Sequence, residues 1–370
     1  MIYLDNAATT KVRPEVIDEM VNVMTNYYAN ADSTHDKGIE IAKLIKERKK
    51  IFKKLLGIDC DNVYFTSGGG EGNNLILNSL VKTHKSGRII STKIEHPSVL
   101  ETIKNLSEIY EICYVDVDEY GFVDINHLQS LITSDTILVS IATVNSELGT
   151  IQDISKIVRV VKEKNKDTLV HTDFVQALGH ISLNFSNIDI DAITFSSHKI
   201  YGPKGIGAVY IKKGVKIKQQ SFGSNVENKF TKRTMPNELV FGFLKAMELL
   251  SEKDIEKLAE IKNYTISKLE EIKICKINGP LNSSPGILNV AFKNAKGEII
   301  LNYLSSQNIF VSTGSACSSK KGNSEIVKQI GLPKEYQDGV IRISFGIEND
   351  ISQIDIFIKE LKSVLNLMGV

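Results

Sequence analysis

Apolar runs with the length of a β-strand alternate with helical patterns through the first 210 residues, and this alternation limits the possible folds more than any other feature. Residues 154–163 show the helical pattern, because their apolar side chains recur at the spacing of one helix face. Further helices are expected from about residue 73 and over residues 98–107. The alternation predicts an α/β fold in which helices cover both faces of a mainly parallel sheet. The expected strands are residues 62–66, 88–92, 110–115, 136–142, 168–172, 192–196 and 208–212.

The pattern changes after about residue 235. Residues 238–271 have helical periodicity, and two later apolar runs predict strands at 287–292 and 340–344. Asp350 is expected to cap a final helix that has one apolar face. The residues of that face are Ile354, Phe357, Ile358, Leu361, Val364 and Leu365.

The length of 370 residues fits two domains of ordinary size better than a single core. We place the boundary near residue 250, where the pattern has changed. The expected large domain covers residues 12–250, and a smaller α+β domain combines residues 251–370 with residues 1–11.

Composition excludes several classes of protein. Hydrophobic residues make up 42% of the chain and charged residues 24%, as in soluble globular proteins, and the net charge is only +1. A field this weak does not draw in nucleic acid or an anionic membrane. With no signal peptide and no apolar run of membrane-spanning length, we expect a cytoplasmic protein without membrane or nucleic-acid partners. Its four cysteines form no Cys-x-x-Cys pair, so no metal site is expected.

A glycine-rich motif, Ser-Gly-Gly-Gly-Glu-Gly-Asn-Asn, covers residues 67–74 between an expected strand and an expected helix. Glycines let backbone N–H groups converge, and a helix N-terminus adds partial positive charge, so such a motif can bind phosphate. The spacing matches neither the dinucleotide-binding nor the Walker motif. A plain tight turn explains the same residues equally well.

Three side chains that can carry chemistry follow the ends of predicted strands: His96, Asp173 and Lys199. Asp173 could equally be a helix cap, and an isolated His96 could be a surface residue. Lysine amines form Schiff bases with carbonyls when desolvation lowers their pKa. A phosphate site, a carboxylate for a pyridinium nitrogen and a Schiff-base lysine are together what pyridoxal 5'-phosphate (PLP) requires. The ordered set therefore predicts a PLP enzyme.

The chain resembles the cysteine desulfurases of the NifS/IscS type, which are class V aminotransferase-like PLP enzymes of fold type I. The resemblance extends from about residue 3 to residue 344, almost the whole chain. Its most specific motifs are Ser-Ser-His-Lys-Ile-Tyr-Gly-Pro-Lys-Gly at 196–205 and the small-residue loop that contains Cys317. Glu-His-Pro at 95–97 and His-Thr-Asp at 171–173 also match.

The resemblance implies a role for each matching residue. Lys199 would hold the cofactor and move protons, His96 would stack on its ring, and Cys317 would accept the sulfur. Thr234 would reach the phosphate in the partner subunit, which implies a homodimer with shared sites. The other expected cofactor contacts are Gly69, Gly70, Ser146, Asp173, Gln176, Ser196 and His198, and the expected substrate contacts are Asn145 and Arg342.

The sequence departs from the family pattern mainly around the cofactor. Gly70 stands where a threonine is usual, Ser146 replaces an asparagine, and Phe174 and Val175 replace smaller or polar residues. The stretch before Thr234 also differs from the family pattern. One lost neutral hydrogen bond costs about 0.5–1.5 kcal/mol, so no single change need prevent cofactor binding.

These departures leave three interpretations of function. The first is a cysteine desulfurase that converts L-cysteine to L-alanine and leaves a persulfide on Cys317, for an iron–sulfur scaffold or a tRNA thiolation enzyme. The second is a related PLP-dependent lyase that acts on selenocysteine or another cysteine derivative. The third is a non-catalytic interaction protein. An enzyme is favoured by the retention of the five expected site residues Lys199, Asp173, His96, Cys317 and Arg342.

Overall fold

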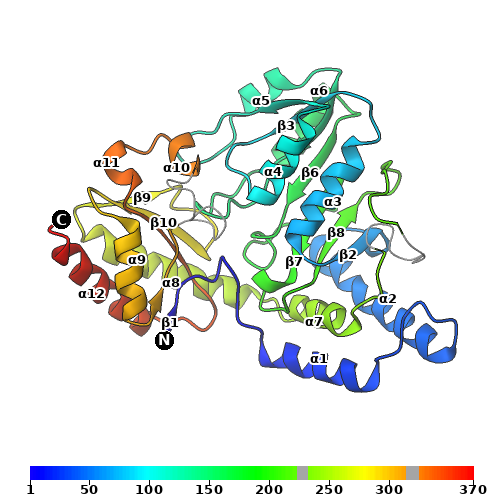
Figure 1. The fold of residues 1–370 in the computed structure, drawn as a ribbon, viewed down its shortest axis with the longest axis horizontal. Helices are drawn as coiled ribbons and strands as arrows, with labels where there is room; N and C mark the ends of the chain where they lie inside the picture. The colour runs from blue at the N-terminus through cyan, green and yellow to red at the C-terminus, as the bar shows by residue number, and fades with distance from the viewer. Residues whose placement is uncertain (223–231, 314–324) are drawn as a thin grey trace.

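The computed structural model describes residues 1–222, 232–313 and 325–370 (Figure 1). In these residues one large sheet has the strand order β2-β8-β7-β6-β5-β3-β4. Strands β3 to β7 run parallel to their neighbours within that group, whereas β8 is antiparallel to both β7 and β2. The prediction of an α/β fold with a mainly parallel sheet is confirmed. The strands are β2 (Val63–Thr66), β3 (Arg88–Ser91), β4 (Glu111–Tyr114), β5 (Thr136–Ser140), β6 (Leu169–Asp173), β7 (Ala192–Ser196) and β8 (Gly207–Ile211).

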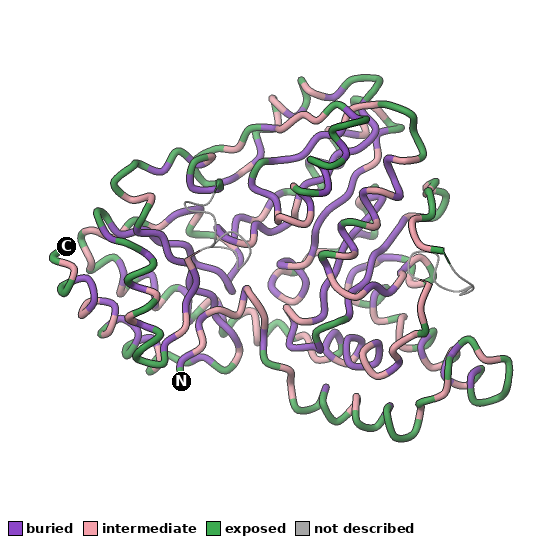
Figure 2. Tube along the Cα trace, viewed as in Figure 1, coloured by how far each residue is buried: buried purple, intermediate pink, exposed green. Residues whose placement is uncertain are grey.

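Helices cover both faces of this sheet, so its central strands are buried throughout (Figure 2). Neighbouring residues of a strand face opposite sides: Leu138 of β5 packs in the cluster of α3 and α4, and Val139 packs in that of α2, α6 and α7. The helices around the sheet are α1 (Pro14–Asn26), α2 (Asp36–Leu56), α3 (Gly69–Val81), α4 (Pro97–Leu106), α5 (Ile125–Leu131), α6 (Ile154–Lys164) and α7 (Asn237–Glu248), with short 3-10 helices η1 (Cys60–Asn62) and η2 (Ser197–Lys199).

A second, antiparallel sheet has the order β12-β10-β9 and its own apolar core. Strands β1 and β11, from segments far apart in sequence, pair in parallel as a separate two-stranded sheet, and the bridges Asp5–Ser344 and Ser312–Arg342 connect this pair to β12. The division of the chain into domains near residue 250 stays a prediction. The elements here are β1 (Ile2–Tyr3), β9 (Cys275–Asn278), β10 (Ile287–Phe292), β11 (Ile309–Phe310), β12 (Val340–Ser344), α8 (Glu252–Glu270), α9 (Gly297–Ser306), α10 (Glu325–Gln329), α11 (Lys334–Gln337) and α12 (Ile351–Leu367).

Helix α12 confirms the predicted pattern. The side chain of Asp350 accepts a hydrogen bond from the Gln353 N–H, and every residue of the expected apolar face is buried. The helix therefore packs on the core of the second sheet through the stripe that its sequence defines.

The predicted start of α3 was wrong. The helix begins at Gly69, so the glycines form its first turn instead of a turn before it. Close packing on the sheet explains them: a Cβ at Gly69 would lie 2.7 Å from Val175 Cγ2, and a Cβ at Gly72 would lie 2.9 Å from Thr194 Cγ2. The glycines allow the helix N-terminus to approach the carboxyl ends of the strands.

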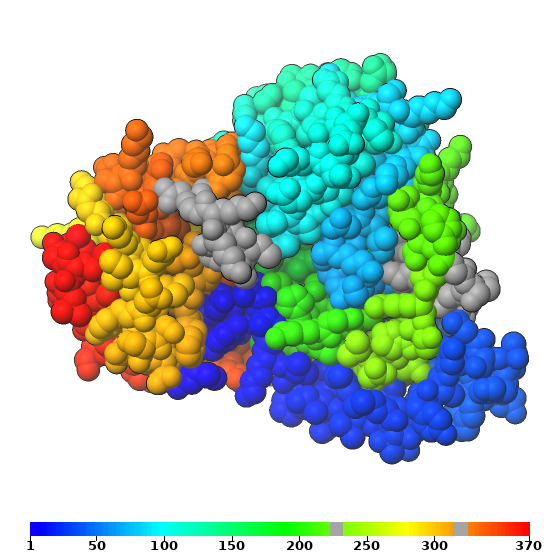
Figure 3. Space-filling model, viewed as in Figure 1, coloured from blue at the N-terminus to red at the C-terminus, as the bar shows by residue number. Residues whose placement is uncertain are grey.

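The N-terminal segment lies between the two sheets, where Figure 3 shows the first residues beside both parts of the molecule. The Ser344 N–H of β12 donates a hydrogen bond to Leu4 O. The Thr10 N–H donates to the carbonyl oxygen of His198, in η2 directly after β7 of the large sheet. No helix in the described part of the chain is sufficiently long and apolar to cross a membrane.

Candidate active site

A cavity of about 250 Å³ opens where β6 and β7 end, beside the start of α3. Residues from the N-terminal segment, five connections of the large sheet and β12 line it. Of the thirteen residues expected from the sequence to form the site, the cavity brings together Gly69, Gly70, His96, Asn145, Ser146, Asp173, Gln176, Ser196, His198, Lys199 and Arg342.

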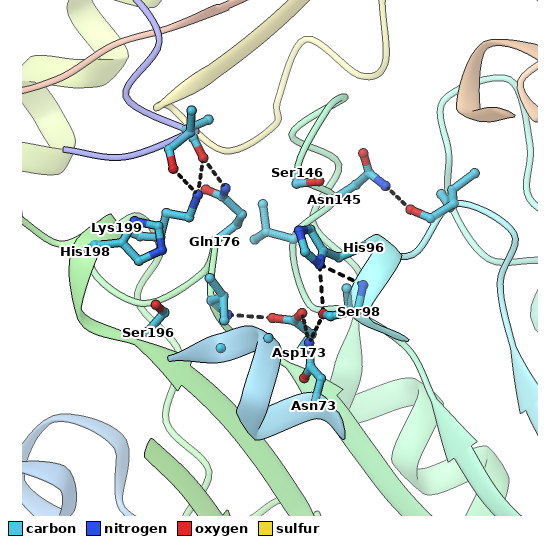
Figure 4. Close-up of a pocket in the computed structure, with 18 of the residues that line it drawn as sticks. Asn73, His96, Ser98, Asn145, Ser146, Asp173, Gln176, Ser196, His198 and Lys199 are labelled. Carbon is cyan, nitrogen blue, oxygen red and sulfur yellow. Dashed lines mark hydrogen bonds between the residues drawn. The ribbon is translucent and has the colours of Figure 1, made fainter. Parts of the chain in front are cut away.

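Lys199 is the last residue of η2, directly after β7. Its Nζ donates hydrogen bonds to the carbonyl oxygens of Ala7, at 2.5 Å, and Ala8, at 2.7 Å (Figure 4). Gln176 Nε2 also donates to Ala7 O, at 2.8 Å. The N-terminal segment thus holds the lysine amine at the cavity wall through two backbone carbonyls.

Asp173 ends β6 and is almost completely buried, with 7% of its surface exposed. Its Oδ1 accepts from the Val175 N–H at 2.9 Å, and its Oδ2 accepts from Asn73 Nδ2 at 2.7 Å. The carboxylate therefore both stabilises the turn after β6 and lines the cavity, so the two interpretations of this residue are compatible.

His96 caps α4, because its Nδ1 accepts from the Ser98 N–H at 3.1 Å. The Ser98 hydroxyl lies 2.8 Å from the same nitrogen. Burial lowers the pKa of His96, the Asp173 carboxylate opposes that shift, and Lys199 adds to it. A lowered pKa agrees with a neutral imidazole whose Nδ1 is an acceptor.

One end of the cavity suits an anion. The first turn of α3, at Gly69 and Gly70, presents backbone N–H groups there, and Ser196 Oγ is buried without a hydrogen-bond partner among the described residues. His198 Nδ1 lies 3.2 Å from Thr9 Oγ1, and burial, with a smaller contribution from Lys199, lowers the pKa of His198 to about 4.

The opposite side carries a buried cation, Arg342 of β12, with 1% of its surface exposed. One terminal nitrogen lies 2.9 Å from Asp5 Oδ1, and the other donates to Ser146 O, also at 2.9 Å. Its Nε has no partner among the described residues. A buried guanidinium with a donor to spare is suited to binding a carboxylate.

Asn145 faces the cavity, but its polar atoms are used within its own loop. Its Nδ2 donates to Ile94 O at 2.8 Å, and its Oδ1 accepts from the N–H groups of Glu147 and Leu148. Its predicted contact with substrate stays a prediction.

Of the two remaining expected site residues, the structure describes only one. Thr234 is exposed and precedes α7, and it does not line the cavity. Cys317 lies outside the described residues. Of the two changes after Asp173, Val175 lines the cavity, whereas Phe174 packs in the core against Phe185 and Phe195.

Sequence reasoning missed Asn73 and Ser98, which also line the cavity. Asn73 lies one helical turn after Gly69 and so shares its side of α3. Because the predicted helix began near residue 73, the prediction did not place Gly69 and Asn73 on the same side of one helix. Ser98 carried a weaker signal, since a serine two residues after a histidine is common in loops.

Known proteins match almost the whole chain. The family model for class V aminotransferases matches residues 2–357. The chain is 37% identical to the cysteine desulfurase IscS of Clostridium botulinum (strain Kyoto / Type A2), over 98% of this chain and 94% of that protein. It is 39% identical to the enzyme of the same name from Dictyoglomus turgidum, over 94% and 90%.

Solved structures agree with these matches. A NifS-like protein superposes with a TM-score of 0.93 at 35% identity, over 99% of both chains. A structure described as SspA in complex with cysteine superposes with a TM-score of 0.84 at 28% identity, over 95% of this chain and 100% of that one.

The fold and the matched family define a PLP-dependent enzyme of fold type I. Within the class V aminotransferase family, the chain belongs to the cysteine desulfurases of the IscS/NifS type. The residues present fit PLP: the unpaired Ser196 hydroxyl and the α3 N-terminus suit its phosphate, Asp173 suits its pyridine nitrogen, and Lys199 suits its aldehyde.

Proposed function

We propose that this enzyme removes the sulfur of L-cysteine, releases L-alanine and places the sulfur on Cys317. The observation that carries the proposal is the meeting of Lys199, Asp173 and the buried Arg342 around one cavity. The relatives support the same reaction, and one similar structure was solved with cysteine.

Each described residue has a task in this proposal. The α3 N-terminus, Ser196, His198 and Gln176 hold the cofactor, and Asp173 faces its ring nitrogen. Arg342 binds the substrate carboxylate through the side of its guanidinium that carries the unpaired Nε. These contacts orient the substrate so that its α-carbon faces Lys199.

PLP, when bound, supplies a sink for the electron pair that remains at the substrate α-carbon. The Lys199 amine takes the α-proton and later returns a proton to the product. The carbonyls of Ala7 and Ala8 receive the ammonium that results, since both lie within hydrogen-bond distance of Nζ.

The sulfur then moves to the Cys317 thiolate, which attacks the substrate sulfur. The S–C bond breaks, its electron pair goes to the departing carbon, and that carbon is protonated to give alanine. We propose that the persulfide is passed to a partner protein, an iron–sulfur scaffold or a tRNA thiolation enzyme.

We further propose a homodimer in which Thr234 of each chain completes the site of the other. The exposure of Thr234 and its absence from the lining of its own cavity support this arrangement. The free thiols of Cys60, Cys113 and Cys275 agree with a reducing compartment, and we place the enzyme in the cytoplasm.

The test is the release of sulfide and alanine from L-cysteine by PLP-supplemented enzyme with a thiol reductant. Equal amounts of both products are expected, and Cys317→Ser should release neither at the wild-type rate. Cys60→Ser is the matched control, since this half-buried thiol lies in η1 away from the cavity. Normal sulfide release from Cys317→Ser would remove that residue from the mechanism.

A further inference from the structure

A chain of hydrogen bonds connects the Asp173 carboxylate to the His96 ring (Figure 4). Asn73 Nδ2 lies 2.7 Å from Asp173 Oδ2 and 2.9 Å from Ser98 Oγ. Ser98 Oγ in turn lies 2.8 Å from His96 Nδ1. Helix α3 thus connects the end of β6 to the start of α4 through one amide group.

The direction of each hydrogen bond in this chain is fixed from its two ends. A carboxylate oxygen can only accept, so the atom of Asn73 that faces Asp173 is the amide nitrogen. At the other end the Ser98 N–H donates to His96 Nδ1, so this nitrogen carries no proton. The Ser98 hydroxyl therefore accepts from Asn73 and donates to Nδ1, and the proton of the neutral ring lies on Nε2.

The surroundings of Asn73 show that its orientation serves these two bonds. Its side chain is buried, with 1% of its surface exposed, and both amide protons are used. Its Oδ1 has no partner among the described residues. Burying the Asn73 side-chain carbonyl without a hydrogen bond costs free energy. The two hydrogen bonds from Nδ2 to Asp173 and Ser98 offset this cost and keep the amide in its orientation.

We propose that Asn73 is a positioning residue of the cofactor site, which orients the Asp173 carboxylate and, through the Ser98 hydroxyl, supports the second of the two hydrogen bonds that hold the His96 ring with its proton on Nε2. The inference rests on the proposed function, in which Asp173 and His96 face PLP. Two donors saturate Nδ1, so His96 presents an N–H group through Nε2 and does not take up a proton at Nδ1.

Nitrogen-15 NMR of the histidine-labelled holoenzyme tests the proton position directly. The His96 signals, assigned by their loss in His96→Asn, should show a protonated Nε2 and an unprotonated Nδ1. Asn73→Ala frees the Ser98 hydroxyl to rotate away from Nδ1, so the Nδ1 signal should shift as one of its two hydrogen bonds is lost, while the Ser98 N–H keeps the ring proton on Nε2. A residue that only packs α3 on the sheet would not change the signal of His96 Nδ1.

Cofactor binding gives the second readout. Titration of the protein with PLP, followed by its visible absorbance, should show an affinity at least about tenfold lower in Asn73→Ala, because a hydrogen bond to a charged group is lost. Asn74→Ala is the matched control: this neighbour is exposed, and its side chain bonds only to Gly70 O and the Thr102 hydroxyl among the described residues. It should bind PLP as the wild type does.

Substitution of Ser98 interrupts the same chain of hydrogen bonds one step closer to His96, and it provides the test if Asn73→Ala fails to fold. Ser98→Ala should change the His96 signals, and Ser98→Thr, which keeps the hydroxyl, should restore them. Unchanged His96 signals in both Asn73→Ala and Ser98→Ala overturn the proposal. Absence of PLP binding by the wild type would instead overturn the proposed function, and with it the role of Asn73 toward the cofactor.

Discussion

At the scale of single residues, Gly70 is where this site differs most clearly from the pattern that the sequence resembles. The family usually has a threonine there, and the resemblance implied that its hydroxyl contacts phosphate. A Cβ at Gly70 would meet no atom closer than Ser98 Cβ, at 3.9 Å, and the backbone needs no glycine. The site therefore has room for a threonine side chain at position 70, and only its hydroxyl donor is missing.

Gly70→Thr should raise the affinity for PLP by about 2- to 10-fold, the effect of one added hydrogen bond of about 0.5–1.5 kcal/mol. Equilibrium titration of the protein with PLP measures it. Gly70→Val has nearly the same shape without the hydroxyl and should leave the affinity close to that of the wild type. Equal gains in both variants would show that shape or helix propensity is responsible, and not the donor.

At the scale of elements, the approach of α3 to the ends of β6 and β7 determines the shape of the cavity. Gly69 permits this approach, and Val175 fills the space against it. The small size of Gly69 and the larger side chain of Val175 on the facing loop thus complement each other. The same contact brings Asn73 to Asp173, so the distance between helix and sheet controls the hydrogen-bond chain as well.

Gly69→Ala should lower the free energy of unfolding by about 1–3 kcal/mol, because its Cβ would lie 2.7 Å from Val175 Cγ2 and one of the two must move. Urea denaturation measures the change. In the double variant Gly69→Ala/Val175→Ala the space is free again, and most of the loss should be recovered. Additive losses in the double variant would contradict the proposed contact.

At the scale of the whole molecule, several ionisable groups are buried without charge. Burial lowers the pKa of His171 to about 3 and that of His180 to about 4, and it raises the pKa of Glu95 to about 8. His171 lies inside the large sheet, between Ser140 and Thr194. His180 lies against Gly286, at the junction with the second sheet.

Stability should therefore fall as the pH decreases from about 6.5 toward 4. In this range the unfolded chain binds protons at His171, His180 and His198, whereas the folded chain keeps these rings neutral. Glu95 acts in the opposite direction, because the folded chain already holds its proton there. Two net protons correspond to about 3 kcal/mol per pH unit.

Urea denaturation at pH 7, 6 and 5 measures this dependence. His171→Gln should reduce the slope by roughly 1.4 kcal/mol per pH unit, the share of one proton, even if the variant is less stable at every pH. An unfolding free energy that is constant between pH 7 and pH 5 would contradict the neutral state of these rings.

The proposed shared site makes a second prediction at this scale. Lys199→Ala and Thr234→Arg should each abolish activity, the second because a bulky cation would enter the partner's cavity. After the two variants are mixed and their subunits exchanged, activity should return, since one site of each mixed dimer has both residues intact. A mixture that stays inactive after proven exchange would contradict the sharing of Thr234.

The sequence by itself determined the α/β class, the strands of the large sheet, strands β10 and β12 of the second sheet, the final helix and most residues that surround the cavity. These depend on periodicity and on short motifs, which are properties of neighbours along the chain. Only the tertiary structure decided that α3 begins at Gly69, that Phe174 faces the core and that the N-terminal carbonyls hold Lys199. The position of Asn73 in the site was also decided only by the tertiary structure, because its hydrogen-bond partners Asp173 and Ser98 are 100 and 25 residues away along the chain. Local pattern carries no information about which distant side chains a fold brings within hydrogen-bond distance.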